Sequence, residues 1–249
     1  MLRNGDGNIE WLQFPTLLRF PEIEHAVFPS KGGYSKAPYS SLNCSLSVGD
    51  EKENVYKNRA IVQSVVGAKS LYFPQQVHGI NIQKIEQDTT CLEGDADALI
   101  TQDKGKALAI LHADCQAALF YDPSTQVIAA VHAGWRGLIQ SIYTKVLDKL
   151  EKEMCVKRGN LQVAIAPSLG PCCAQFLHYK EELPETMWDF QRKDNYFDLW
   201  AFSRFVLEES GIPEENIEIS SICTKCHTDF FSYRRNKITG RNSSVIMLR

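Results

Sequence analysis

The chain has 249 residues, of which 44% are hydrophobic and 23% are charged, the proportions of an ordinary globular protein. A net charge of −3 and the lack of long lysine or arginine runs argue against a nucleic-acid-binding protein. The sequence contains neither the roughly 18–20 apolar residues of a membrane span nor the apolar stretch of a signal peptide, so we expect no membrane association and a cytoplasmic location.

The first half of the chain contains one early helix among many expected strands. Strands are predicted over residues 8–14 and 25–29, followed by a turn at Gly32-Gly33 and a helix over residues 50–66 that ends at Gly67. Further strand candidates are residues 71–77, 80–85, 97–101, 107–111, 116–121 and 126–132. Consecutive strands without long helices between them favour an α+β fold with mixed or antiparallel sheets, in a single domain over residues 1–249.

After His132 the apolar residues recur at helical spacing, which predicts one continuous helix over residues 135–150. These apolar residues are Trp135, Leu138, Ile139, Ile142, Val146, Leu147 and Leu150. The first turn of this helix, with Arg136 beside exposed backbone N–H groups, is a candidate anion site, and a solvated arginine is the alternative. Later strands are predicted over residues 161–166, 217–222 and 244–248, and a helix over residues 197–209.

The eight cysteines are expected to be reduced, because disulfide frameworks belong to small secreted chains. Cys223-x-x-Cys226-His227 has the form of half a zinc site. Cys172, Cys173 or His178 would have to complete it, and the alternative is a set of plain buried thiols.

His78, Cys115 and His132 each lie at the end of a predicted strand. Two histidines and a cysteine can form a three-ligand zinc site with one position left for water or substrate. They can equally form a cysteine nucleophile with a histidine base. The spacing of the residues leaves both chemistries open.

A series of residue blocks over nearly the whole chain resembles the signature blocks of the YfiH/LACC family, also called laccase-domain or DUF152 proteins. The blocks are Gly33 with Pro38-Tyr39-Ser40-Ser41-Leu42-Asn43, Asn58-Arg59, Gln76-Val77-His78-Gly79, Asp95-Ala96-Asp97-Ala98, Ala113-Asp114-Cys115, His132-Ala133-Gly134-Trp135-Arg136-Gly137 and Phe231-Ser232-Tyr233-Arg234-Arg235. Members of this family were long labelled multicopper polyphenol oxidases and are now described as purine nucleoside phosphorylases with adenosine deaminase activity.

The resemblance implies a mixed-sheet, layered α/β sandwich, shared with cysteine deamidases of the cytotoxic-necrotizing-factor type. It also implies a zinc ion held by His78, Cys115 and His132. Zinc can lower the pKa of its bound water to about 7, which suits deamination of adenosine. The implied substrates are phosphate and purine nucleosides such as adenosine, inosine or methylthioadenosine.

Catalytic roles fall by this resemblance on Asp114, Cys115 and His132, with Asp114 orienting a ligand or moving a proton. Phosphate contacts are expected from the cationic residues Lys31, Arg59 and Arg136. Substrate contacts are expected from the polar loop residues Asn43 and Ser168. Lys31 stands where most relatives have arginine, so it keeps the charge without the bidentate geometry. Alternation along the strand puts His112 on the face of Asp114 rather than of Cys115.

Two other functions are compatible with the same residues. A His/His/Cys set can bind copper, as in a laccase-like polyphenol oxidase, although a multicopper oxidase needs about ten histidines in His-x-His pairs and this chain has 6 histidines. A metal-free hydrolase or deamidase would use Cys115 as nucleophile and His132 as base. The expected assembly is a monomer or weak oligomer.

Overall fold

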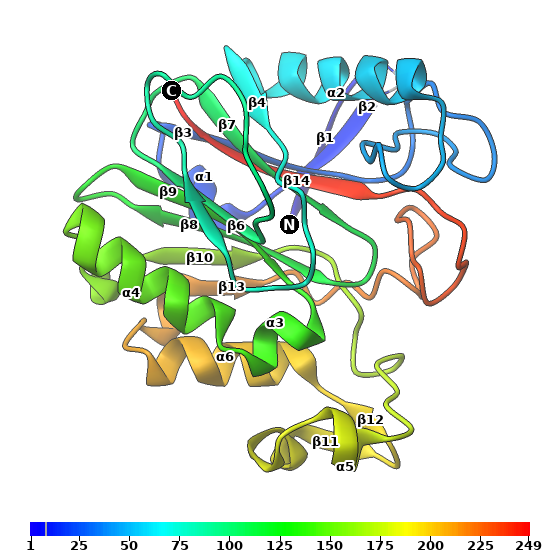
Figure 1. The fold of residues 1–249 in the computed structure, drawn as a ribbon, viewed down its shortest axis with the longest axis vertical. Helices are drawn as coiled ribbons and strands as arrows, with labels where there is room; N and C mark the ends of the chain where they lie inside the picture. Colours follow the sequence, from blue (N-terminus) through cyan, green and yellow to red (C-terminus); the bar gives the residue numbers. More distant parts are fainter. Residues whose placement is uncertain (8) are drawn as a thin grey trace.

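Two stacked six-stranded sheets form the centre of the molecule in the computed structural model, which describes residues 1–7 and 9–249 (Figure 1). The first sheet has the order β1 (Leu2–Asp6), β2 (Ile9–Gln13), β3 (Ile23–Phe28), β14 (Asn242–Leu248), β7 (Lys106–His112) and β4 (Ser70–Tyr72). The second has the order β13 (Ile217–Ile219), β10 (Gln162–Ile165), β8 (Gln116–Asp122), β9 (Val127–Ala133), β6 (Ala98–Thr101) and β5 (Ile82–Lys84).

Both sheets are mixed. The pairs β4–β7, β5–β6 and β10–β13 are parallel, whereas the central pairs are antiparallel. In the first sheet β14 pairs antiparallel with both β3 and β7, so the C-terminal strand lies at the middle of the sheet. The predicted α+β class with mixed sheets is therefore confirmed.

The space between the sheets holds one layer of the core. Leu108 and Ile246 point into it from the first sheet, and Leu119 and Tyr121 from the second. Their neighbours on the same strands point the other way, because successive side chains of a strand alternate between its two faces. On the outer face of the first sheet, helix α2 (Lys52–Val66) packs through Val62 and Val66.

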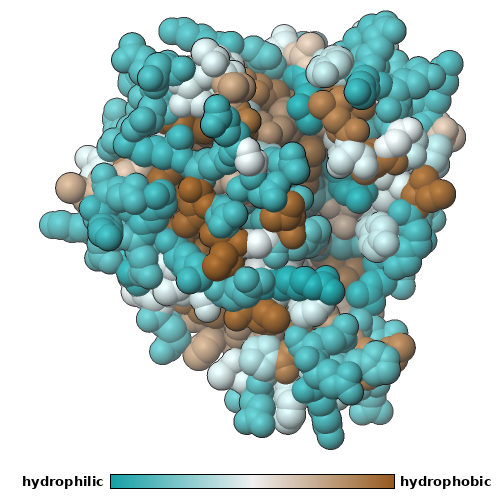
Figure 2. Space-filling model, viewed as in Figure 1, coloured by the Kyte–Doolittle hydropathy of each residue, from teal (hydrophilic) through white to brown (hydrophobic). Residues whose placement is uncertain are grey.

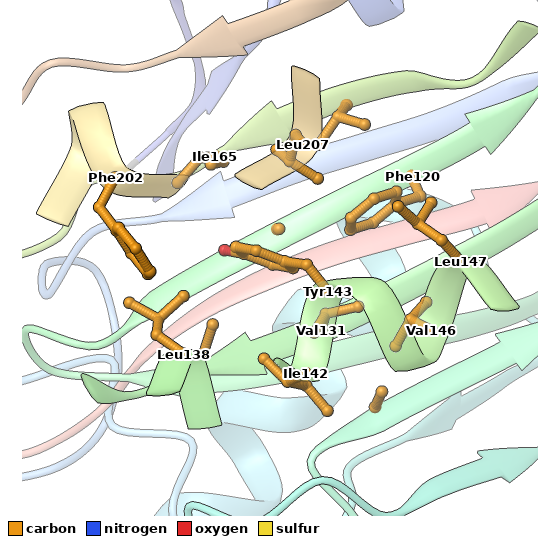
Figure 3. Close-up of a cluster of buried hydrophobic side chains, with 14 of the residues drawn as sticks. Phe120, Val131, Leu138, Ile142, Tyr143, Val146, Leu147, Ile165, Phe202 and Leu207 are labelled. Atoms are coloured by element: carbon orange, nitrogen blue, oxygen red, sulfur yellow. The ribbon is translucent and has the colours of Figure 1, made fainter. Parts of the chain in front are cut away.

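Helices α3 (Trp135–Ile139), α4 (Ile142–Met154) and α6 (Leu199–Glu209) cover the outer face of the second sheet (Figure 1). Tyr143 is central to this layer and lies among side chains of α4, the sheet and α6 (Figure 3). Its hydroxyl donates to Gln116 Oε1 at 2.7 Å, and Gln116 Nε2 donates to the Leu199 carbonyl at 3.0 Å. These bonds fix the start of β8 against two helices.

The remaining elements are short. They are α1 (Pro15–Leu18), α5 (Tyr179–Glu182), β11 (Gln191–Lys193), β12 (Tyr196–Phe197) and the 3₁₀ turns Arg158–Asn160, Glu185–Phe190 and Glu214–Asn216. No helix in the part of the chain described combines the length and apolarity needed to cross a membrane. On the face shown in Figure 2, hydrophilic residues predominate and apolar residues form separate groups.

Several sequence-based boundaries are corrected by the structure. The single helix predicted over residues 135–150 is two helices, because Ser141 at the junction has a φ of 63°, which a continuous helix does not allow. The helix predicted over residues 197–209 begins at Leu199, since Phe197 pairs in β12. Asn8, the first residue of the first predicted strand, lies outside the described residues.

The strand predicted over residues 71–77 is also too long. Only Ser70–Tyr72 forms a strand, in the first sheet, whereas β5 belongs to the second. Residues 73–81 therefore do not close a hairpin but cross from one sheet to the other. This crossing carries His78.

Candidate functional site

Three separate segments bring His78, Cys115 and His132 together at one end of the stacked sheets. His78 lies in the crossing between β4 and β5, Cys115 in the turn between β7 and β8, and His132 on β9. One ligand atom of each residue lies within 4.8 Å of the others. Cys115 Sγ is 3.6 Å from His78 Nε2, and the two imidazole rings meet edge to face with centroids 4.8 Å apart.

The side chain of Gln76 holds the crossing segment in place. Gln76 Nε2 donates to the Leu111 carbonyl at 2.7 Å, and Gln76 Oε1 accepts the Leu111 N–H at 2.9 Å. This double hydrogen bond fixes the segment to the end of β7. His78 itself has a φ of 61°, an uncommon backbone conformation for a residue with a side chain.

Asp97 is fully buried and connects both histidines. Its Oδ1 accepts the Nδ1–H of His132 at 2.7 Å and the backbone N–H of His78 at 2.9 Å. Its Oδ2 accepts the backbone N–H groups of Val77 at 3.2 Å and Gly79 at 2.7 Å. Because Nδ1 of His132 donates to Asp97, the other ring nitrogen, Nε2, is the one available to a metal ion, and it lies on the side of Cys115.

Gly134 leaves the room that these ligands need. A Cβ at this position would lie 2.7 Å from His78 Cδ2 and 3.2 Å from Cys115 Sγ. The backbone at Gly134 is extended, with φ −71° and ψ 165°, so glycine is required here for space and not for its conformation.

Opposite charges stabilise one another within the group. Burial alone would raise the pKa of the Cys115 thiol, but the charges and hydrogen bonds of His132 and His78 lower it. Burial would lower the pKa of His132, yet Cys115 and Asp97 raise it. Burial would also raise the pKa of Asp97, but hydrogen bonds from His132 and from the Gly79 N–H lower it. The lowered pKa of Cys115 and the raised pKa of His132 therefore have one cause, the mutual stabilisation of the two neighbouring groups.

The same atoms fit a metal ion. The donor set of one thiolate and two imidazoles is one that Zn²⁺ accepts, and three protein ligands leave one coordination position open. Asp97 supplies the carboxylate partner that metal-binding histidines generally have on their second nitrogen. Gly134 leaves space for the three donor atoms, which lie within 4.8 Å of one another.

A cavity of about 1210 Å³ opens over this group. Five cationic side chains and one acidic side chain, Asp114, are among its described lining residues. The cationic ones are Arg59, Arg136, Arg234, Lys237 and Arg241. The aromatic ones are Phe73, Trp135, Phe176 and Tyr233. Positive charge together with aromatic faces suits a ligand that carries an anionic group and a planar ring.

The chain is similar to known proteins over most of its length. The family model described as multi-copper polyphenol oxidoreductase laccase matches residues 24–249. The chain belongs to this laccase-like family. It is 32% identical to a protein of Bacteroides thetaiotaomicron named purine nucleoside phosphorylase, over 95% of this chain and 96% of that protein.

Two solved structures have the same fold. YlmD from Geobacillus stearothermophilus superposes with a TM-score of 0.88 at 30% identity, covering 99% of this chain and 98% of that one. The protein YfiH of Bacillus licheniformis has a TM-score of 0.85 at 30% identity, covering 91% of this chain and 93% of that one. The predicted resemblance to the YfiH family is thereby confirmed.

In this laccase-like chain the predicted phosphate residues occupy different places. Arg136 and Arg59 line the cavity; Arg136 stacks on Trp135, and Arg59 stacks on Phe73 while its Nε donates to the Cys44 carbonyl at 2.8 Å. Lys31 does not belong to the lining described. Its Nζ pairs with Asp229 at 2.7 Å, and its side chain is 66% exposed.

Asn43 and Ser168 are buried and bonded within the protein. Asn43 Oδ1 accepts the backbone N–H of Arg241 at 2.9 Å, so it holds the loop that carries this arginine. Ser168 Oγ accepts the indole N–H of Trp200 at 2.7 Å. Neither belongs to the described cavity lining, and both have a structural explanation.

Asp114 lines the cavity, but loop groups already engage both of its oxygens. Oδ1 accepts the Thr224 hydroxyl and Oδ2 accepts the Arg234 N–H, each at 2.6 Å. His112 Nε2 lies 2.8 Å from Ser244 Oγ, and its buried Nδ1 has no protein partner. His112 thus lines the cavity beside the three-residue group without joining it.

Sequence reasoning did not identify Asp97 or Arg241 as site residues. Asp97 was visible as part of the Asp95-Ala96-Asp97-Ala98 block, where a carboxylate precedes an apolar strand. Arg241 precedes β14 and reaches the site only because β14 lies between β3 and β7. Burial lowers the pKa of Arg241, while the negative charges of Cys115 and Asp114 act in the opposite direction.

Proposed function

We propose that this chain is a zinc-dependent purine nucleoside phosphorylase that also deaminates adenosine. The observation that carries the proposal is the single cavity that combines a Cys/His/His group with five cationic side chains and several aromatic ones. The relatives named purine nucleoside phosphorylase support it, because the chain aligns with one of them over almost its full length.

The phosphate ion is proposed to bind Arg136 and Arg241, with Arg59 contributing further positive charge to the same cavity. Charge-assisted hydrogen bonds from guanidinium groups match the oxygens of a phosphate dianion. One nitrogen of Arg241, Nη1, donates to the carbonyl oxygens of Thr239 and Gly240. Lys31 is left out of this set, since its ion pair with Asp229 occupies it.

The purine ring is proposed to lie against the aromatic side chains of the cavity. Trp135 and Phe176 meet edge to face with centroids 5.9 Å apart, and Tyr233 stands on the loop that also carries Arg234. Flat apolar surfaces of this kind accept a planar base with little selection among purines.

In the proposed reaction a phosphate oxygen attacks C1′ of the nucleoside. The new C1′–O bond forms as the C1′–N9 bond breaks, and the purine leaves with the bonding electrons and takes up a proton. The arginines place the anionic nucleophile beside the positive charge that develops on the ribose. The products are the free base and ribose 1-phosphate.

His78, Cys115 and His132 are proposed to hold the zinc ion. When bound, zinc supplies a Lewis acid that polarises a reacting group and, for deamination, activates water. Asp97 fixes the orientation of His132 and the backbone of His78 around it. Asp114 is assigned a positioning role, because its carboxylate holds Thr224 and Arg234 at the cavity wall.

The experiment is incubation of the purified protein with adenosine or inosine, with and without phosphate. We expect free base and ribose 1-phosphate only when phosphate is present, and inosine from adenosine in its absence. Metal analysis of protein prepared without added copper accompanies it. Stoichiometric copper with phenol oxidation proportional to the copper content would favour the oxidase instead.

One observation favours a second candidate, a metal-free thiol hydrolase or deamidase. Cys115, His132 and Asp97 form a chain of nucleophile, base and orienting carboxylate. Chelation separates the two candidates. Activity that survives removal of metal but is abolished by thiol alkylation belongs to the hydrolase, whereas loss on chelation and recovery with zinc belongs to the phosphorylase.

The cysteine thiols of this chain also indicate the cellular compartment in which the protein acts. All eight cysteines are free, including the exposed Cys91 and Cys155. Unpaired thiols persist in a reducing compartment. We therefore propose a cytoplasmic location for the activity.

A further inference from the structure

A second group of metal-type ligands lies outside the Cys/His/His site. Cys172 and Cys173 follow β10, and Cys223 and Cys226 follow β13, about fifty residues later in the chain. Their four sulfur atoms all lie within 4.8 Å of one another. Cys173 and Cys223 are buried, whereas Cys172 and Cys226 are exposed, so the group lies just beneath the surface.

The spacing of the sulfurs matches a tetrahedral thiolate site. Cys226 Sγ is 3.6 Å from both Cys172 Sγ and Cys173 Sγ. Four sulfurs at the usual Zn–S distance of about 2.3 Å form a tetrahedron with edges of about 3.8 Å. A disulfide would instead need sulfurs about 2.05 Å apart. The group therefore has the dimensions of a metal site and not of a bonded pair.

The backbone around the cysteines is fixed independently of any metal. Ser168 N donates to the Ile222 carbonyl at 3.2 Å, and Thr224 N donates to the Ser168 carbonyl at 3.0 Å, which joins the two loops. Cys226 N donates to the Cys223 carbonyl at 3.1 Å, closing the C-x-x-C turn.

Gly170 allows the two loops to meet. A Cβ there would lie 3.0 Å from Cys223 Cβ and 2.8 Å from the Trp200 ring. A larger residue at this position would require the side chains of Trp200 and Cys223 to move. The close approach is therefore built into the sequence and the chain packing.

We propose that Cys172, Cys173, Cys223 and Cys226 bind a structural Zn²⁺ ion, separate from the metal of the Cys/His/His site. Four thiolates close the coordination sphere and leave no position for substrate, as in structural zinc sites. A C-x-x-C pair beside a second pair of cysteines, in a chain with reduced thiols, favours metal binding over disulfide formation.

This zinc would stabilise one wall of the cavity. Leu169 N, three residues before Cys172, donates to the Asp114 carbonyl at 2.8 Å. Thr224, next to Cys223, donates its hydroxyl to Asp114 Oδ1 at 2.6 Å. Joining the two loops through a metal would thus hold Asp114, the neighbour of Cys115, from both sides.

The test is metal analysis and zinc X-ray absorption spectroscopy on the full-length His132→Ala variant, which lacks a ligand of the Cys/His/His site but keeps all four cysteines. We expect one zinc ion per chain, surrounded only by sulfur at about 2.3 Å. The wild type should hold two zinc ions, with nitrogen ligands contributing to the average. The zinc content and sulfur coordination of His132→Ala do not depend on phosphorolysis or on the Cys/His/His site, so they test the four-cysteine site separately from the proposed function.

A pair of double variants completes the test. Cys172→Ser/Cys226→Ser should lose one zinc ion per chain, whereas Cys91→Ser/Cys155→Ser, which changes two exposed cysteines outside the group, should lose none. A His132→Ala protein that is folded but free of zinc would overturn the proposal. A Cys172–Cys226 disulfide in protein purified under reducing conditions would overturn it as well.

Discussion

Asp97 and His132 form a buried hydrogen bond of 2.7 Å, and the carboxylate oxygen that makes it also accepts the backbone N–H of His78. One side chain thereby sets the tautomer of one histidine and the position of the other. Asp97 therefore connects His78, on the crossing between the two sheets, with His132, on strand β9.

Asp97→Asn should weaken metal binding while preserving the fold. An amide keeps the size of the carboxylate but cannot accept all the N–H groups that point at it, so His132 loses its fixed orientation. Loss of such a partner typically costs 10- to 100-fold in metal affinity or activity. Competition with a chromogenic chelator measures the affinity. Asp95→Asn, at an exposed position two residues away, is the matched control and should bind metal like the wild type.

Gly134→Ala should remove the metal by crowding. The added methyl group would lie 2.7 Å from His78 Cδ2, closer than carbon atoms approach, so the imidazole must move away from Cys115. The backbone conformation at this position suits alanine, so thermal unfolding should change little. Gly159→Ala, where a Cβ meets nothing within 4 Å, serves as the control. Full metal occupancy in Gly134→Ala would show that the donors are not held as described.

Arg241→Ala should raise KM for phosphate far more than it lowers kcat. A hydrogen bond to a charged group contributes about 1.5–3 kcal/mol, which corresponds to an increase of roughly 10- to 100-fold. Steady-state kinetics at varied phosphate and saturating nucleoside give both constants. Lys145→Ala, an exposed position on α4 outside the cavity lining, is the charge-matched control. An unchanged KM in Arg241→Ala would assign the phosphate to other residues.

The free energy of unfolding should decrease as the pH is lowered, because His25 is buried in its uncharged form. Burial lowers the pKa of His25 to about 4, and its Nε2 accepts the N–H of Phe14 at 2.8 Å. The unfolded chain, with an ordinary histidine pKa of about 6.5, binds the proton first as the pH falls. The free energy of unfolding therefore holds above pH 6.5 and decreases by roughly 3 kcal/mol towards pH 4 on account of this residue.

The measurement is chemical unfolding of the wild type and of His25→Gln between pH 7 and pH 4. The glutamine variant, which has no titratable group at this position, should show a shallower decrease. Equal slopes for the two proteins would mean that His25 does not contribute.

The strands that carry Cys115 and His132 could be predicted from sequence because their signal is local. Both β8 and β9 have apolar interiors that are buried on both faces; Cys115 immediately precedes β8, and His132 is the next-to-last residue of β9. The break between α3 and α4 could not be predicted in the same way. The apolar spacing continues through the junction, and only the left-handed backbone at Ser141 interrupts the helix.

Residues whose role depends on distant pairing were harder to predict. His78 was expected at the end of a strand over residues 71–77, but it lies where the chain crosses between sheets, since β4 pairs with β7 and β5 pairs with β6. Arg241 approaches Cys115 only through the central position of the C-terminal strand. The sequence likewise left three partners open for the C-x-x-C pair, and the fold brings Cys172 and Cys173 to it, with His178 outside the group.

Phosphorolysis with phosphate carrying ¹⁸O at every oxygen tests the proposed function most directly. If phosphate attacks C1′, ribose 1-phosphate forms in equal amount to the free base and retains all the labelled oxygens, because the bond to C1′ is made by a phosphate oxygen. Mass spectrometry of the sugar phosphate measures this. Free base that appears together with unphosphorylated ribose, at a rate independent of phosphate, would contradict the account.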